Sequence, residues 1–309
     1  MAKVTFRDYP QILKETFNAF MADKGLKLSA SLAYYTIFSL APMLIVLLSI
    51  GGIFYGQDAL QGKVFSQIND FIGTDAAVQI QTTLQKLQLS GKSTTAAITG
   101  LITLLIGATG IFVEIQDSIN QIWRVKAVPK KGWLKLIINR ILSLSMIASL
   151  GFLLIVSLLI NSLVLIFSDV LMRFLPEFTF IFIDALNLGI TFLVLMVLFG
   201  VIYKVLPDVE IKWKQIKAGA FFTALLFMLG KYLIGLYIQF AAVADIYGAA
   251  GTVVVIAVWV YYSAAILFFG AEFTWAYAKV RGDTIRPSKH AVAIKQVEVE
   301  QDNKPVDLT

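Results

Sequence analysis

One apolar stretch in the C-terminal third limits what this chain can fold into. From Asp245 to Tyr277 the sequence reads DIYGAAGTVVVIAVWVYYSAAILFFGAEFTWAY, and no charged residue separates Asp245 from Glu272. A helix needs about 20 mainly apolar residues to cross the hydrocarbon core of a bilayer. The stretch therefore predicts a transmembrane helix with aromatic residues in its middle and a carboxylate near its far end.

Five further segments have the same character, so we expect an all-α integral membrane protein with six transmembrane helices. The chain is 58% hydrophobic and 15% charged, whereas soluble domains are about 45–50% apolar and about 25% charged. We expect an N-terminal segment at 1–27, a single six-helix bundle at 28–277 and a loose polar tail at 278–309. The other five predicted spans cover residues 28–54, 94–113, 136–167, 178–203 and 216–240.

Two amphipathic features lie outside these spans. Residues 4–22 carry Leu13, Phe17 and Phe20 at helical spacing among charged side chains. This pattern favours a short amphipathic helix on the membrane face, and a helix packed under the bundle fits it equally well. The outer loop at 55–93 repeats apolar residues at helical spacing as well, which predicts two short helices at the outer mouth of the bundle.

The basic residues indicate the orientation, because cytoplasmic loops of membrane proteins carry an excess of Lys and Arg. Of the 26 Lys and Arg residues, 21 fall on the side that contains both termini, and four fall on the opposite side. The remaining one, Lys231, lies inside a predicted span. We therefore expect both termini to be cytoplasmic.

Lys231 and several polar residues within spans are candidates for a substrate-binding interior. A Lys at the centre of a span costs about 2.5–3.5 kcal/mol on insertion scales, and such residues usually face a bundle interior or a wet cavity. The alternative is a structural ion pair with Asp184 or Asp245. The full set of candidate substrate-binding residues is Lys231, Gln239, Asp184, Asn187, Tyr35 and Tyr262.

Three carboxylates lie near the predicted cytoplasmic ends of spans and are candidates for gating or proton coupling. Glu114 and Asp117 continue a helical stripe of small residues in the second span, and Glu272 lies in the sixth. Buried acids with perturbed titration cluster at functional sites. The alternative is that these acids are solvated or pair with nearby basic residues such as Arg124.

The residue inventory argues against several kinds of enzyme. The chain has no Cys, its single His is His290 in the polar tail, and it contains no Gly-Lys-Ser/Thr phosphate loop. A Ser-His-Asp triad or a zinc site would need residues that the predicted spans do not contain. We therefore expect no catalytic residues, no metal, no cofactor and no nucleic-acid partner.

Four blocks of sequence carry a family resemblance. They read KLSASLAYYTIFSLAPMLI, GATGIFVEIQDSINQIWRV, LPDVEIKWKQIKAGAFFTALLFMLGKYLIGLYI and YGAAGTVVVIAVWVYYSAAILFFGAE. In this order they resemble the YihY/BrkB family of bacterial inner-membrane proteins. The resemblance implies six membrane helices and the bacterial cytoplasmic membrane, but no settled activity and no catalytic residue set. Members have been labelled as a ribonuclease, which is a misassignment, as serum-resistance virulence factors, and as transporters linked to export of envelope lipids.

Two functions from different classes follow from these observations. The first is a transporter or translocator of the cytoplasmic membrane, with an anionic amphiphile or envelope lipid as substrate. The second is a non-transporting membrane scaffold or envelope assembly factor, whose polar stripes only hold helices together. An intramembrane enzyme has the least support. Membrane lipids are the expected partners, and a homo-oligomer is left open.

Overall fold

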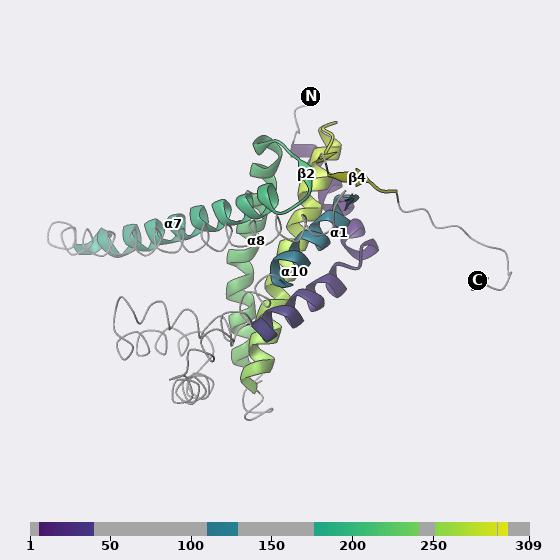
Figure 1. The fold of residues 1–309 in the computed structure, drawn as a ribbon. Coiled ribbons are helices and arrows are strands. Elements are labelled where there is room, and N and C mark those ends of the chain that lie inside the picture. Colours follow the sequence, from purple (N-terminus) through teal and green to yellow (C-terminus); the bar gives the residue numbers. More distant parts are fainter. Residues whose placement is uncertain (1–5, 40–109, 129–175, 241–250, 289, 296–309) are drawn as a thin grey trace, which may run out of the picture.

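The computed structural model describes residues 6–39, 110–128, 176–240, 251–288 and 290–295, which are mostly helical (Figure 1). The predicted outer loop, the third span and large parts of the first two spans lie outside the described residues. In chain order the elements are η1 (Phe6–Asp8), α1 (Tyr9–Ala22), a helix over 25–39, a helix over 110–122, β1 (Val125–Ala127), α7 (Pro176–Val205), β2 (Val209–Glu210), α8 (Trp213–Phe240), α10 (Gly251–Val280), β3 (Arg286–Pro287) and β4 (Ala291–Ala293).

Three of these helices are long and apolar enough to cross a membrane. The apolar windows are Leu188–Val205 in α7, Trp213–Ile234 in α8 and Val254–Val280 in α10. They coincide with the predicted fourth, fifth and sixth spans. α8 and α10 lie side by side, and α7 contacts α8 while its N-terminal part extends away from the pair (Figure 1).

Small residues bring α8 and α10 into close contact through a reciprocal arrangement. A Cβ atom added at Gly219 of α8 would lie 1.8 Å from Thr274 Oγ1 of α10, and one added at Gly270 of α10 would lie 1.9 Å from Thr223 Oγ1 of α8. Each threonine hydroxyl donates to the glycine carbonyl four residues earlier, Thr223 to Gly219 at 2.7 Å and Thr274 to Gly270 at 2.8 Å. Glycine and small hydroxyl residues four apart are typical of tightly packed membrane helices. We call these four residues the glycine–threonine seam.

Tyr203 joins α7 to this pair. Its buried hydroxyl donates to the Leu267 carbonyl of α10 at 2.7 Å and lies 3.0 Å from Thr223 Oγ1. A buried tyrosine needs such a partner for its hydroxyl. The three long helices are therefore tied together at one level by side-chain hydrogen bonds as well as by packing.

α1 packs against α10 on one face and exposes apolar side chains on another. Ile12, Thr16 and Phe20 are buried, whereas Leu13 and Phe17 are exposed. The helix ends where Lys24 adopts φ +57 and the Phe20 ring covers Gly25, at which an added Cβ would lie 2.2 Å from the ring. A glycine is needed at that close approach. The chain then reverses into the helix over 25–39.

The segment after α10 pairs with two connectors from distant parts of the chain. β4 is antiparallel to β1, with Val125 opposite Ala293, and β3 is antiparallel to β2, with Val209 opposite Pro287. The expectation of a loose tail is therefore wrong for the paired residues Arg286–Pro287 and Ala291–Ala293. Strands of two or three residues are too short to produce a periodic pattern in the sequence, which is why this pairing was not predicted.

Candidate functional site

Three charged residues from separate elements gather beside the C-terminal third of α10. Arg124 Nη1 lies 2.5 Å from Asp23 Oδ1. Asp23 follows α1, and Arg124 follows the helix over 110–122 with φ +58, a left-handed conformation that turns the chain into β1. Glu272 of α10 interacts electrostatically with both Asp23 and Arg124. We call Asp23, Arg124 and Glu272 the charged cluster.

Glu272 is the least satisfied member of the charged cluster. It is 1% exposed, and the side-chain hydrogen bond that it makes is with another acid, Asp23. No described amide, hydroxyl or basic group donates to the Glu272 oxygens or to Asp23 Oδ2. A buried polar group left unsatisfied costs about 1–3 kcal/mol. In native structures such a group calls for an explanation, for example a functional role or a bound water or ion.

The neighbouring residues fix the position of this carboxylate. The Trp123 indole N–H donates to the Ala271 carbonyl at 3.0 Å, so the residues just before Arg124 and Glu272 are bonded to each other. Gln121 Nε2 donates to the Asp23 carbonyl at 3.3 Å. Glu272 lies about 12 Å along α10 from its end at Val280, at a rise of about 1.5 Å per residue. The carboxylate is therefore held inside the apolar window of α10.

A second polar junction lies beside the cluster. Asp208 Oδ2 accepts hydrogen bonds from Asn120 Nδ2 at 2.9 Å and Gln116 Nε2 at 3.1 Å, and the Asp208 N–H donates to Asn120 Oδ1 at 2.8 Å. The Asp208 carbonyl accepts from the Ser288 N–H at 2.9 Å. The connector after α7 is thus bonded both to the helix over 110–122 and to the C-terminal segment.

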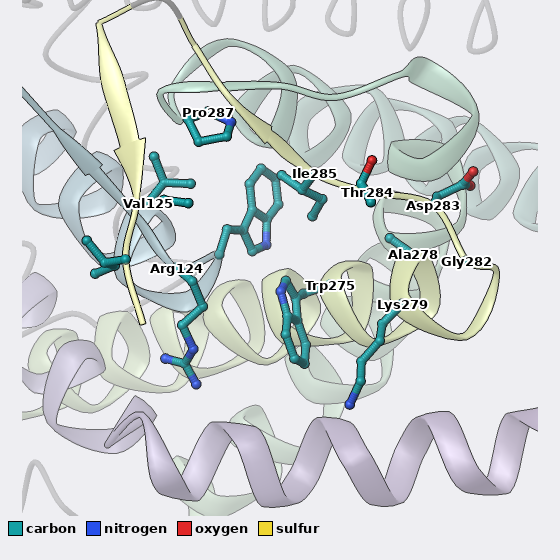
Figure 2. Close-up of a pocket in the computed structure, with 13 residues that line it drawn as sticks. Arg124, Val125, Trp275, Ala278, Lys279, Gly282, Asp283, Thr284, Ile285 and Pro287 are labelled. Atoms are coloured by element: carbon teal, nitrogen blue, oxygen red, sulfur yellow. The ribbon is translucent and has the colours of Figure 1, made fainter. Parts of the chain in front are cut away.

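A pocket of about 470 Å³ adjoins the charged cluster. In Figure 2 the side chains of Arg124, Trp275 and Lys279 project to the same side, toward the N-terminal helical segment. The pocket is thus bounded by the turn before β1, the last turns of α10 and the C-terminal segment. Its lining consists of Trp123, Arg124, Val125, Trp275, Ala278, Lys279, Gly282, Asp283, Thr284, Ile285, Pro287, Ala293 and Ile294.

The predicted substrate-binding residues do not form one described site. Lys231 is exposed on α8 and Tyr35 is exposed on the helix over 25–39, whereas Tyr262 is half-buried on α10 with its ring against Gly230. The side chains of the remaining three are outside the described part of the structure. Those residues are Asp184 and Asn187 on α7 and Gln239 on α8. Substrate binding by this set stays a prediction.

The three predicted gating residues differ in their surroundings. Glu272 is buried in the charged cluster, Glu114 is half-buried, and Asp117 is exposed on the helix over 110–122. The sequence reasoning missed Asp23, whose only signal is an acid two residues before Gly25, in the turn between two helices. Among the described residues no group of three or more His, Asp or Glu side chains could hold a metal ion.

The fold and this site define a helical integral membrane protein. The chain belongs to the family described as virulence factor BrkB, whose model matches residues 16–295, so the predicted YihY/BrkB membership is confirmed. It is 29% identical over 280 residues to a UPF0761 membrane protein of Verminephrobacter eiseniae, covering 89% of this chain and 63% of that protein.

Other relatives carry the same name. A UPF0761 membrane protein of Pseudomonas paraeruginosa is 30% identical over 282 residues, covering 86% of this chain and 62% of the relative. One of Vibrio vulnificus is 30% identical over 254 residues, covering 79% of this chain and 75% of the relative. The chain thus spans under two thirds of the length of the first two relatives. No solved structure matches it.

Proposed function

We propose that this protein is a transporter or translocator of the bacterial cytoplasmic membrane. It has six spans and two cytoplasmic termini, and it moves an anionic amphiphile, such as an envelope lipid, without converting it chemically. The observation that supports this proposal is Glu272, an acid that is 1% exposed within an apolar membrane helix and whose side-chain hydrogen bond is with a second buried acid, Asp23. Ionisable residues inside membranes are costly and usually mark substrate or ion pathways.

The charged cluster supplies a gate with two pairings. In this structure Arg124 is bound to Asp23, and Glu272 accepts no hydrogen bond from a described amide, hydroxyl or basic group. An exchange of Arg124 from Asp23 to Glu272 shifts the end of α1 relative to α10, because the two carboxylates belong to those different elements. Arg124 is suited to this exchange since its planar guanidinium can bind carboxylates in a forked geometry.

Lipid translocation in vesicles tests this function. The purified protein is reconstituted into liposomes with fluorescent phosphatidylglycerol, and dithionite added outside bleaches only the lipid that has reached the outer leaflet. We expect faster bleaching than in protein-free liposomes and, for Glu272→Ala, a loss of about tenfold in translocation rate, equivalent to about 1.4 kcal/mol. The exposed Glu210 of β2 offers a control, Glu210→Ala, that keeps the wild-type rate. Equal bleaching in protein-containing and protein-free liposomes contradicts lipid translocation.

The glycine–threonine seam favours a second function, a membrane scaffold. Gly219 and Gly270 allow a contact between α8 and α10 that leaves no room for even a methyl group, and such packing can serve assembly alone. The two functions differ in whether water reaches the polar interior. In this Cys-free chain, a single cysteine at Ser263 reacts with a water-soluble maleimide if a wet path exists, because only an ionised, accessible thiol reacts quickly. A cysteine at exposed Thr284 controls for reagent activity.

A further inference from the structure

The pocket beside the charged cluster straddles the border of the apolar part of α10. The apolar window ends at Val280. Trp275 and Lys279 line the pocket from within that window, and Thr284 and Ile285 line it from beyond. Tryptophan and basic side chains are typical of this level of a membrane protein, where hydrocarbon gives way to headgroups. The pocket is therefore at the depth at which a lipid headgroup lies.

The walls of the pocket suit a ligand with an apolar part. Two indole rings, those of Trp123 and Trp275, line it together with aliphatic side chains such as Val125 and Ile285. The Trp123 N–H is already bonded to the Ala271 carbonyl, so this indole is fixed in place. A volume of about 470 Å³ lies within the range of about 300–1,000 Å³ that small-molecule pockets occupy.

The charge at the pocket favours an anion. Arg124 and Lys279 project to one side of it (Figure 2), and the carboxylate in its lining, Asp283, lies 3.5 Å from the Arg281 guanidinium. The residues just beside the lining add further positive charge, since Lys126, Arg286 and Lys295 are all exposed. Basic clusters at the membrane surface attract anionic lipids.

Lys279 can exchange its present partner for a ligand at little cost. Its Nζ lies 3.3 Å from Glu15 Oε2 in a solvent-exposed pair, and exposed pairs of this kind contribute little to stability. The same ammonium lies 5.3 Å from the centre of the Trp275 ring, a cation–π contact that keeps it at the pocket.

The helix beside the pocket carries a lipid-facing surface. Tyr9, Leu13, Phe17 and Met21 of α1 are exposed at steps of four residues, which places them on one helical face. An exposed apolar stripe on a helix next to basic residues is typical of helices that lie in the membrane interface. Glu15 of the same helix contacts Lys279 at the pocket, so α1 offers a surface along which acyl chains can lie.

We propose that this pocket binds the phosphate-bearing headgroup of an anionic phospholipid, with the phosphate at Lys279 and the glycerol and upper acyl atoms against the two indole rings. The binding itself does not depend on transport. One further statement rests on the proposed function, namely that the bound lipid is the transported substrate. In that case the pocket is where the lipid enters the protein.

Native mass spectrometry of the full chain in detergent tests the site, with phosphatidylglycerol and phosphatidylcholine as probes. We expect wild type to retain phosphatidylglycerol selectively and Lys279→Glu to weaken that binding by about 25-fold, because each unit of charge near the surface contributes a factor of about five and the reversal changes the charge by two units. Lys217→Glu is the matched control, because Lys217 is an exposed Lys in the first turns of α8 and outside the pocket lining. Equal losses in both variants, or no preference for phosphatidylglycerol, overturn the proposal.

A single cysteine at Thr284, which lines the pocket, locates the ligand. Phosphatidylglycerol should slow its maleimide labelling several-fold, whereas phosphatidylcholine should not, because labelling requires an accessible thiolate. Glycerol phosphate at the same concentration distinguishes a lipid headgroup from a soluble phosphate ester. If this soluble compound protects the cysteine as well as the lipid does, the lipid assignment is overturned. If phosphatidylglycerol protects the cysteine but the liposome assay shows no translocation, the lipid-binding site stands and only the proposed transport is contradicted.

Discussion

Two faces of α10 within the same two helical turns differ in how their polar groups are satisfied. Gly270 and Thr274 face α8 in the seam, where each threonine hydroxyl is bonded and fills the space above a glycine. Glu272 lies between them in sequence, on another face of the helix, and its oxygens accept no hydrogen bond from a described amide, hydroxyl or basic group. One face is built for stability, and the other carries a group that costs stability.

The seam face of α10 contributes to folding, whereas the Glu272 face carries the residue proposed to function in transport. Packing at the seam depends on shape, so any added atom should destabilise the protein. An unsatisfied buried carboxylate should instead be replaceable without loss of stability, since well-packed apolar groups often do better than buried charge. The free energy of unfolding of variants on the two faces of α10 therefore measures this difference.

The largest effect is expected at the seam. In Gly219→Ala the new methyl group overlaps Thr274 Oγ1, since a Cβ there would lie 1.8 Å from that atom. Overpacking of this severity costs about 3 kcal/mol. Thermal unfolding in detergent should show a large fall in Tm, and adding Thr274→Ala should restore part of it. Gly189→Ala is the control, because nothing lies within 4 Å of a Cβ at that position; a similar loss in both variants contradicts the seam.

A smaller loss is expected at the junction outside the apolar windows. Asp208→Ala removes the acceptor of the Asn120 and Gln116 amides, both of which belong to buried residues. Hydrogen bonds to a charged group contribute about 1.5–3 kcal/mol each, and part is recovered by water at a half-buried site. We expect a destabilisation of about 2 kcal/mol in the same thermal assay. Glu210→Ala, on the adjacent strand and exposed, should leave the Tm unchanged.

A loss of about 1 kcal/mol is expected for Tyr203→Phe. The substitution keeps the ring and removes the hydroxyl that bonds the Leu267 carbonyl and Thr223. The net value of one ordinary hydrogen bond is about 1 kcal/mol, and Thr223 keeps its bond to Gly219. Tyr232→Phe, at an exposed position of α8, provides the comparison. A Tyr203→Phe protein as stable as the Tyr232→Phe protein would mean that packing alone joins α7 to α10.

The helices of this fold could be predicted from the sequence, whereas the charged cluster could not. The runs that form α7, α8 and α10 are long and mainly apolar, and hydropathy reports such runs directly. The cluster and its supports depend on contacts between distant residues, for example Arg124 with Asp23 at a separation of 101 positions and Trp123 with Ala271 at 148. Neither periodicity nor a local motif encodes such a pair.

Glu272 shows how far local reasoning reaches. Its position within an apolar run predicted a functional acid; the structure shows that the residue is buried, and its functional role stays a prediction. Its neighbours could not be predicted, because Asp23 lies in a turn that resembles any other helix boundary. In the same way, the pairing of β4 with β1 is invisible in a tail without an apolar pattern.

The smallest change in stability, and one of opposite sign, is expected at the charged cluster. Glu272→Met preserves the length of the side chain and removes a buried acid whose side-chain hydrogen bond is with another acid, Asp23. Replacing buried ionisable groups by well-packed apolar ones is often neutral or stabilising by about 1 kcal/mol, so the Tm should rise slightly while lipid translocation in liposomes falls. Glu272→Gln separates charge from shape, because it keeps the polar outline without the charge. If Glu272→Met instead lowers the Tm as strongly as Gly219→Ala does, then the carboxylate stabilises the fold and the two faces of α10 do not differ as argued.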